Sequence, residues 1–95
     1  MIKYIIEGKR WFDKINGNTY HSVSITNAKT NTLIYCSGVV YGYDEAYKQT
    51  AFDFLIKNGL FKKENRHNHE LVKKELYFNV ADVNKKRHLD IEVQE

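Results

Sequence analysis

The sequence predicts an α+β fold: an antiparallel three-stranded sheet packed on one main helix (βββα) and followed by a C-terminal β-hairpin. Three observations lead to this prediction: an Asn-Gly pair between two β-rich segments, an apolar stripe of helical spacing in mid-chain, and two alternating segments near the end. Because a chain of 95 residues builds one hydrophobic core, residues 1–95 are expected to form a single α+β domain.

The first two strands are predicted over residues 2–15 and 19–27, which are rich in β-branched and aromatic residues. Gly8 interrupts the first of them, and a glycine inside a strand pattern is typical of a β-bulge. Asn16 and Gly17 separate the two strands. Both residue types tolerate the positive φ of a tight turn, so they predict a two-residue β-hairpin.

A third strand is predicted over residues 32–38, after a four-residue turn at 28–31. The two turns predict these facing pairs: Phe12 with His21, Arg10 with Val23, Ile25 with Ile34, and Val23 with Cys36. Side chains alternate across a strand, so one face of the sheet is expected to carry Phe12, Val23, Ile25, Ile34 and Cys36.

The main helix is predicted over residues 44–58. Asp44 can cap its first turn, and Gly59, just beyond its end, can close it in the left-handed conformation. Four side chains of helical spacing form its apolar stripe: Tyr47, Ala51, Phe54 and Leu55. This stripe is expected to bury itself against the apolar face of the three-stranded sheet.

The last third of the chain is predicted to end in two strands. Residues 62–69 form a polar connector, and residues 70–75 fit either a short helix or the start of a strand. Residues 76–83 and 88–93 alternate apolar and polar side chains, with a polar loop at 84–87 between them. These two segments are the predicted C-terminal β-hairpin.

The predicted sheet face away from the helix carries several aromatic side chains, among them Trp11, Tyr20 and Tyr35. A sheet with one helix behind it leaves these side chains in water, and exposed aromatic groups are typical of partner-binding surfaces. Together with neighbouring basic and tyrosine side chains, the candidate partner-binding residues are Lys9, Arg10, Trp11, Lys14, Tyr20, Tyr35, Tyr41 and Tyr43.

Several partners suit this aromatic face, unless the C-terminal third of the chain covers it. A protein partner fits the aromatic and arginine composition of binding hot spots. Nucleic acid is the alternative, because aromatic rings stack on bases while Lys and Arg neutralise phosphates. A homodimer is a third option, since symmetric interfaces commonly bury such side chains. Asp13 lies in the same patch, which favours a protein over nucleic acid.

No constellation in the sequence predicts catalysis, a cofactor or a metal. His67, Asn68 and His69 spell the name of a nuclease motif, but that motif spreads its residues over two strands and a helix, so a polar loop is expected here. His21 and Cys36 are both expected on the helix-covered face, where a cysteine acts as a small apolar residue. We therefore expect a non-enzymatic protein with no cofactor.

Composition and charge predict a cytoplasmic protein. The net charge of +3 permits contact with nucleic acid without requiring it. The single cysteine, Cys36, excludes an intramolecular disulfide and fits a reducing compartment. The apolar run at residues 1–6 is too short and too polar for a signal peptide or a membrane span. No membrane association is expected.

Two segments, RWFDKINGNTYHSV (residues 10–23) and YGYDEAYKQTA (residues 41–51), resemble a pattern seen in small uncharacterised proteins encoded by phages and prophages. The resemblance extends over residues 9–58 and brings no catalytic residues with it. It implies an accessory protein that binds a host macromolecule inside the bacterial cell, as an inhibitor of a host defence protein in the manner of anti-CRISPR proteins. The residues leave one alternative open, a nucleic-acid-binding βββα module that uses the basic and aromatic sheet face.

Overall fold

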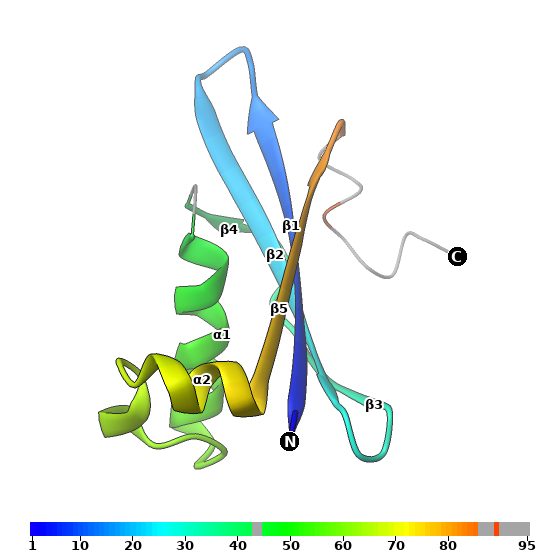
Figure 1. Cartoon of the computed structure of the whole chain (residues 1–95). Helices are drawn as coiled ribbons and strands as arrows, with labels where there is room; N and C mark the ends of the chain where they lie inside the picture. The colour runs from blue at the N-terminus through cyan, green and yellow to red at the C-terminus, as the bar shows by residue number, and fades with distance from the viewer. Residues whose placement is uncertain (43–44, 86–88, 90–95) are drawn as a thin grey trace.

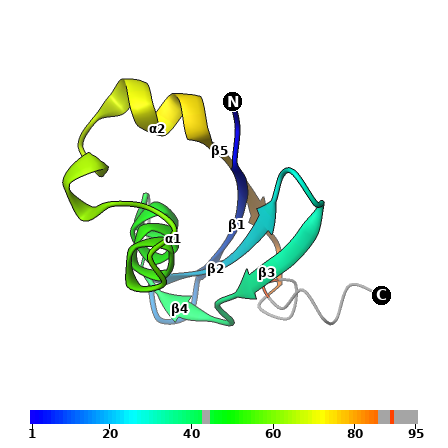
Figure 2. The same cartoon turned by 90° about the horizontal axis from the view of Figure 1, so that it is seen from below.

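The computed structural model describes residues 1–42, 45–85 and 89 (Figure 1). The strands are β1 (Tyr4–Asp13), β2 (Asn18–Asn27), β3 (Thr32–Cys36), β4 (Val40–Tyr41) and β5 (Leu76–Val83). The helices are α1 (Ala46–Lys57), the 3-10 helix η1 (Lys63–Asn65) and α2 (His69–Glu75). Both α-helices lie on one side of the sheet, here called the helix face, as two perpendicular views show (Figures 1 and 2). The opposite side is called the far face.

The fold is α+β, but its sheet has five strands of mixed direction, so the predicted antiparallel three-stranded sheet with a single helix is wrong. The strand order is β3-β2-β1-β5, with the short β4 also pairing with β2. β5 runs parallel to β1, from Tyr4 opposite Leu76 to Trp11 opposite Val83. The physical reason is the connection: α1 and α2 return the chain to the end of the sheet where β1 begins, as a parallel crossover requires (Figure 1).

The β1–β2 hairpin is present, but its turn has four residues, 14–17, because Asp13 pairs with Asn18. The carboxylate of Asp13 accepts hydrogen bonds from the backbone N–H groups of Ile15 at 3.0 Å and Asn16 at 3.3 Å. Gly17 supplies the positive φ, +71°, that closes the turn. The predicted pairs of Phe12 with His21 and Arg10 with Val23 are therefore wrong, each by two positions. A two-residue shift preserves the faces, since side chains alternate with period two.

A β-bulge between β2 and β3 changes the faces predicted for the end of β3. The register shifts between Ile25 and Thr26, so that Ile25 faces Tyr35 and Ser24 faces Cys36. The predicted pairing of Ile25 with Ile34 and of Val23 with Cys36 is therefore wrong. Tyr35 consequently lies on the helix face, with its ring stacked on that of Phe54 at a centroid distance of 4.0 Å.

The hydrophobic core lies between α1 and the helix face. It is formed by nine buried residues: Ile6, Val23, Ile25, Tyr47, Ala51, Phe52, Leu55, Phe61 and Leu76. Three of the four stripe residues predicted for the helix are among them, and Phe54 and Ile34 pack against the cluster while partly exposed. The helix ends as predicted: Gly59 has a φ of +71°, and the N–H of Leu60 reaches back to the carbonyl of Leu55 at 2.8 Å. The predicted cap, Asp44, lies outside the described residues.

Gly8 is not a bulge, because it pairs continuously with Val23 on one side and Val80 on the other. It serves instead as a point of close approach between β1 and α1. A Cβ atom at this position would lie 2.6 Å from Cδ2 and 2.8 Å from Cγ of Tyr47, which is closer than carbon atoms approach without displacement. A side chain here would push α1 away from the sheet.

The described part of the C-terminal third contains the 3-10 helix η1, the α-helix α2 and the strand β5. Residues 69–75 form α2, whose first turn is capped by the side chain of Asn68, which accepts from the N–H of Leu71 at 3.2 Å. The strand predicted over 76–83 is confirmed as β5, but it pairs with β1. Its predicted hairpin partner, 88–93, lies outside the described residues except for Leu89, which is buried and does not belong to the core cluster.

Replacing Gly8 by alanine should therefore destabilise the protein. Gly8→Ala is expected to lower the free energy of unfolding by about 1–3 kcal/mol, the usual effect of overpacking a filled core. In a Tyr47→Ala background the same change should cost much less, because the two closest atoms are gone. Urea unfolding of the unchanged protein, the two single variants and the double variant measures both costs. Sucrose in the buffer stabilises the weaker variants. An equal cost in the two backgrounds would contradict the proposed contact.

Candidate functional site

Three aromatic side chains form a continuous row across the far face, here called the aromatic ladder: Trp11 of β1, Tyr20 of β2 and Tyr41 of β4. The strand register places Trp11 opposite Tyr20, and Tyr20 opposite Tyr41. The rings of Trp11 and Tyr20 are stacked at a centroid distance of 6.0 Å. Tyr20 and Tyr41 meet edge to face at 5.6 Å. Trp11 and Tyr20 thus lie on the same face of the sheet, as predicted.

The ladder is open to solvent at its Tyr41 end. Tyr41 is 64% exposed, while Trp11 and Tyr20 are half-buried. The centre of the far face is closed by contrast, since Ser22 and Ser24 are buried there. Within the ladder, the aromatic surface available to a partner is therefore largest at Tyr41, and Tyr77, near the start of β5, is a separate aromatic side chain that is 55% exposed.

Lys9 is the one predicted basic residue that shares the face of the ladder, two positions before Trp11 on β1. Arg10 points to the helix face, because neighbouring residues of a strand alternate, and its Nε lies 2.9 Å from a carboxylate oxygen of Asp82. The single surface predicted for Lys9, Arg10 and Trp11 is therefore wrong. Alternation divides these residues between two sides of the sheet.

The other predicted residues do not join the ladder. Lys14 is exposed in the hairpin turn, where it lines a shallow hollow with Arg10 and Phe12. Tyr35 is on the helix face because of the β2–β3 bulge, so its predicted place beside Trp11 is wrong. Tyr43 lies outside the described residues.

His21 and Cys36 lie on opposite faces of the sheet, contrary to the prediction that they share one. Cys36 is exposed and pairs with Ser24 of the far face. His21 is buried, with Nδ1 3.1 Å from the carbonyl oxygen of Gly42 and Nε2 2.7 Å from the hydroxyl of Thr50. A carbonyl only accepts, so Nδ1 donates and Nε2 faces the hydroxyl of Thr50. His21 thereby ties β2 to α1 and is separated from Cys36.

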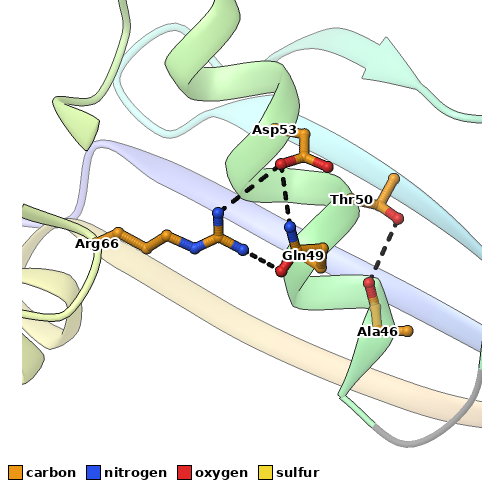
Figure 3. Close-up of polar contacts among 5 residues, drawn as sticks. All are labelled: Ala46, Gln49, Thr50, Asp53 and Arg66. Carbon is orange, nitrogen blue, oxygen red and sulfur yellow. Dashed lines mark hydrogen bonds and ion pairs between the residues drawn. The ribbon is translucent and has the colours of Figure 1, made fainter. Parts of the chain in front are cut away.

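A polar cluster around Arg66 was not predicted from the sequence. Figure 3 shows the guanidinium of Arg66 beside Gln49 and Asp53 of α1. It donates a hydrogen bond to Gln49 and is ion-paired with Asp53, with 3.8 Å between the nitrogen and the carboxylate oxygen. Gln49 also donates to Asp53 at 3.3 Å. The Arg66 guanidinium lies 5.2 Å from the ring centroid of Phe52, within the range of a cation–π contact. The i, i+4 spacing of Gln49 and Asp53 was the signal available in the sequence.

A cavity of about 490 Å³ lies between α1, α2 and the start of β5. Its basic lining residues are Lys48, Arg66, His69 and Lys73, and its apolar ones include Phe52, Val72, Leu76 and Phe78. No sequence pattern suggested this cavity, because its walls come from segments that are far apart in the chain.

Within the described part of the chain, no three His, Cys, Asp or Glu side chains gather as a metal site would require. His67 and His69 are exposed, and Asn68 between them serves as the cap of α2. Burial raises the pKa of the Tyr47 phenol above its usual value, and the nearby ammonium group of Lys48 opposes part of this rise. Tyr47 is therefore a neutral packing residue at physiological pH.

Comparison of the chain with protein-family models, with curated proteins and with solved structures gives no match. None of the helices in residues 1–42 and 45–85 has the length and apolar character needed to cross a membrane. Function must therefore be argued from the geometry of the chain itself.

The buried hydrogen bond between His21 and Thr50 should contribute to stability. Thr50→Val keeps the shape of the side chain but leaves Nε2 of His21 without its partner, so it should cost about 1–3 kcal/mol of unfolding free energy. Thr50→Ser keeps the hydroxyl and serves as the matched control, with a smaller expected cost. Thermal unfolding followed by circular dichroism measures both. Equal stability of the Thr50→Ser and Thr50→Val variants would show that the hydrogen bond between His21 and Thr50 is not made.

Proposed function

We propose that this chain is a non-enzymatic binding protein that docks on a protein partner through the aromatic ladder. The observation that carries this proposal is the unbroken contact of Trp11, Tyr20 and Tyr41, contributed by three strands, on the face away from α1. Tyrosine and tryptophan combine large rigid surfaces with a polar group, and they dominate the energetics of many protein interfaces. A rigid sheet holds the three rings in place before the partner arrives, which limits the entropy lost on binding.

The charges near the ladder favour a protein over nucleic acid. Lys9 and Asp13 both lie on β1 on the ladder side, so the local charge is mixed. Arg10, which would have strengthened a phosphate-binding surface, lies on the other face and is paired with Asp82. Nucleic-acid surfaces concentrate unopposed Lys and Arg side chains along the backbone path. Among the residues that the structure describes, Lys9 is the one candidate basic residue on the ladder side, and Asp13 lies on the same side.

The expected class of partner follows from the resemblance to small phage and prophage proteins. On that basis we propose a host protein inside the bacterial cell, with a component of host defence as the target and inhibition as the outcome. Blocking a protein by occupying its surface requires no catalytic groups, which suits a chain whose buried His21 is hydrogen-bonded to the Gly42 carbonyl and the Thr50 hydroxyl.

The proposal predicts that Tyr41→Ala weakens partner binding without loss of stability. Tyr41 is largely exposed, so its truncation should leave the melting temperature nearly unchanged. If Tyr41 is a binding hot spot, its truncation should make the free energy of binding less favourable by about 2 kcal/mol or more. Leu33→Ala is the control, because Leu33 is 51% exposed on the same face but lies near the start of β3, opposite Thr26 and away from the ladder. Capture of a protein from nuclease-treated bacterial lysate, followed by titration with the purified partner, provides the measurement.

Three other results would contradict the proposal. Capture of nucleic acid alone, lost at raised salt, would favour the nucleic-acid-binding module. A shift of the Tyr41→Ala variant from dimer to monomer in sedimentation would identify a second copy as the partner. Equal weakening by Tyr41→Ala and Leu33→Ala would show that the ladder is not the centre of the interface.

A further inference from the structure

The cavity between α1 and α2 is built by residues at helical spacing on both helices. α1 contributes Lys48 and Phe52, four positions apart, and α2 contributes His69 and Lys73, also four positions apart. The two helices thus turn one face each toward the same space. The cavity volume of about 490 Å³ is in the range of about 300–1,000 Å³ that is typical of small-molecule sites.

The rim of the cavity carries an excess of positive charge. Lys48 is paired with Glu45 at 3.1 Å, and Arg66 is paired with Asp53 at 3.8 Å. Among the residues that the structure describes, Lys73 has neither an ion pair nor a hydrogen bond to its side chain. Glu45 is the acidic residue that lines the cavity, against the charges of Lys48, Arg66 and Lys73.

The floor of the cavity is aromatic and apolar. Phe52 and Phe78 lie there with ring centroids 5.7 Å apart. The ammonium group of Lys48 lies 5.3 Å from the centroid of Phe78, and the guanidinium of Arg66 lies 5.2 Å from that of Phe52. Each of these two aromatic rings therefore has a cation over its face, which leaves the ring edges and the side chains of Val72 and Leu76 as apolar lining next to positive charge. This arrangement suits a ligand with an apolar ring next to an anionic group.

We propose that this cavity binds a small aromatic phosphate, with its ring on the Phe52 and Phe78 floor and its phosphate against Lys73 and its basic neighbours. Phosphate matches the site because it carries up to two negative charges and several acceptor oxygens, which several separate cations can share. The apolar lining residues favour an organic group beside the phosphate. This site is on the helix face, so it is independent of the aromatic ladder and of the function proposed for it.

The test uses phenyl phosphate as the probe, followed by ¹H–¹⁵N NMR spectra of the full chain. Phenyl phosphate should shift the amide signals of Val72, Lys73 and Phe78, and it should bind about tenfold more tightly than inorganic phosphate, because the ring adds buried apolar area. Lys73→Gln should weaken phenyl phosphate binding about tenfold, as the loss of a charge-assisted hydrogen bond does. Lys74→Gln is the matched control, since it removes the same charge from the next position of α2 but outside the cavity lining, and should have little effect.

Several outcomes would overturn the assignment. Equal effects of Lys73→Gln and Lys74→Gln would show attraction by net charge alone. Inorganic phosphate binding as tightly as phenyl phosphate would exclude a role for the aromatic floor. A phosphotyrosine pentapeptide binding far more tightly than phenyl phosphate would assign the site to a peptide. Tyr41→Ala should leave phenyl phosphate binding unchanged, so the proposal for this cavity and the proposal for the aromatic ladder are tested independently.

Discussion

The packing of Tyr47 against Gly8 holds α1 on the sheet, and the rest of the structure depends on this contact. Since a glycine on β1 allows α1 to approach so closely, the helix covers one face completely enough to bury Ile6, Val23 and Leu55. With α1 in place, η1 and α2 bring the chain back to the start of β1, and β5 pairs there in parallel. The same arrangement separates the two proposed binding sites: the aromatic ladder lies on the far face, and the cavity between α1, α2 and β5 lies on the helix face.

Much of the local structure could be predicted from the sequence, because its causes are local. The stripe of α1, the glycine that ends it and the alternation of β5 all depend on residues close together in the chain. The order of the sheet could not be predicted in this way. The alternation of residues 76–83 indicates a strand but does not name its neighbour, and the direction of β5 follows from the path of two helices. The Asp13 carboxylate accepts hydrogen bonds inside the four-residue first turn, and the bulge between Ile25 and Thr26 has no signal in any short residue pattern.

The predictions for the candidate site also divide into those with local causes that were correct and those that were wrong for separate reasons. Trp11 and Tyr20 were correctly placed together, because a register error of two residues leaves faces unchanged. Tyr35 was misplaced by the single-residue shift of a bulge, and Arg10 was grouped with Trp11 although adjacent residues of a strand point to opposite sides. The basic cavity was missed for a different reason. Composition suggested a solvated connector at 62–69, whereas Arg66 within it is held by Gln49, Asp53 and the ring of Phe52.

The central claim is that the aromatic ladder lies on the face of the sheet away from α1 and is accessible to a partner. Acrylamide quenching of tryptophan fluorescence tests it most directly, because Trp11 is the single tryptophan of the chain and lies in the ladder. A half-buried Trp11 on the far face should give a quenching constant between those of a free tryptophan analogue and a fully protected core tryptophan. That constant should stay the same when the protein is diluted. Full protection at every concentration would place Trp11 in a core and contradict the account, and protection that disappears on dilution would show that a second copy covers the ladder.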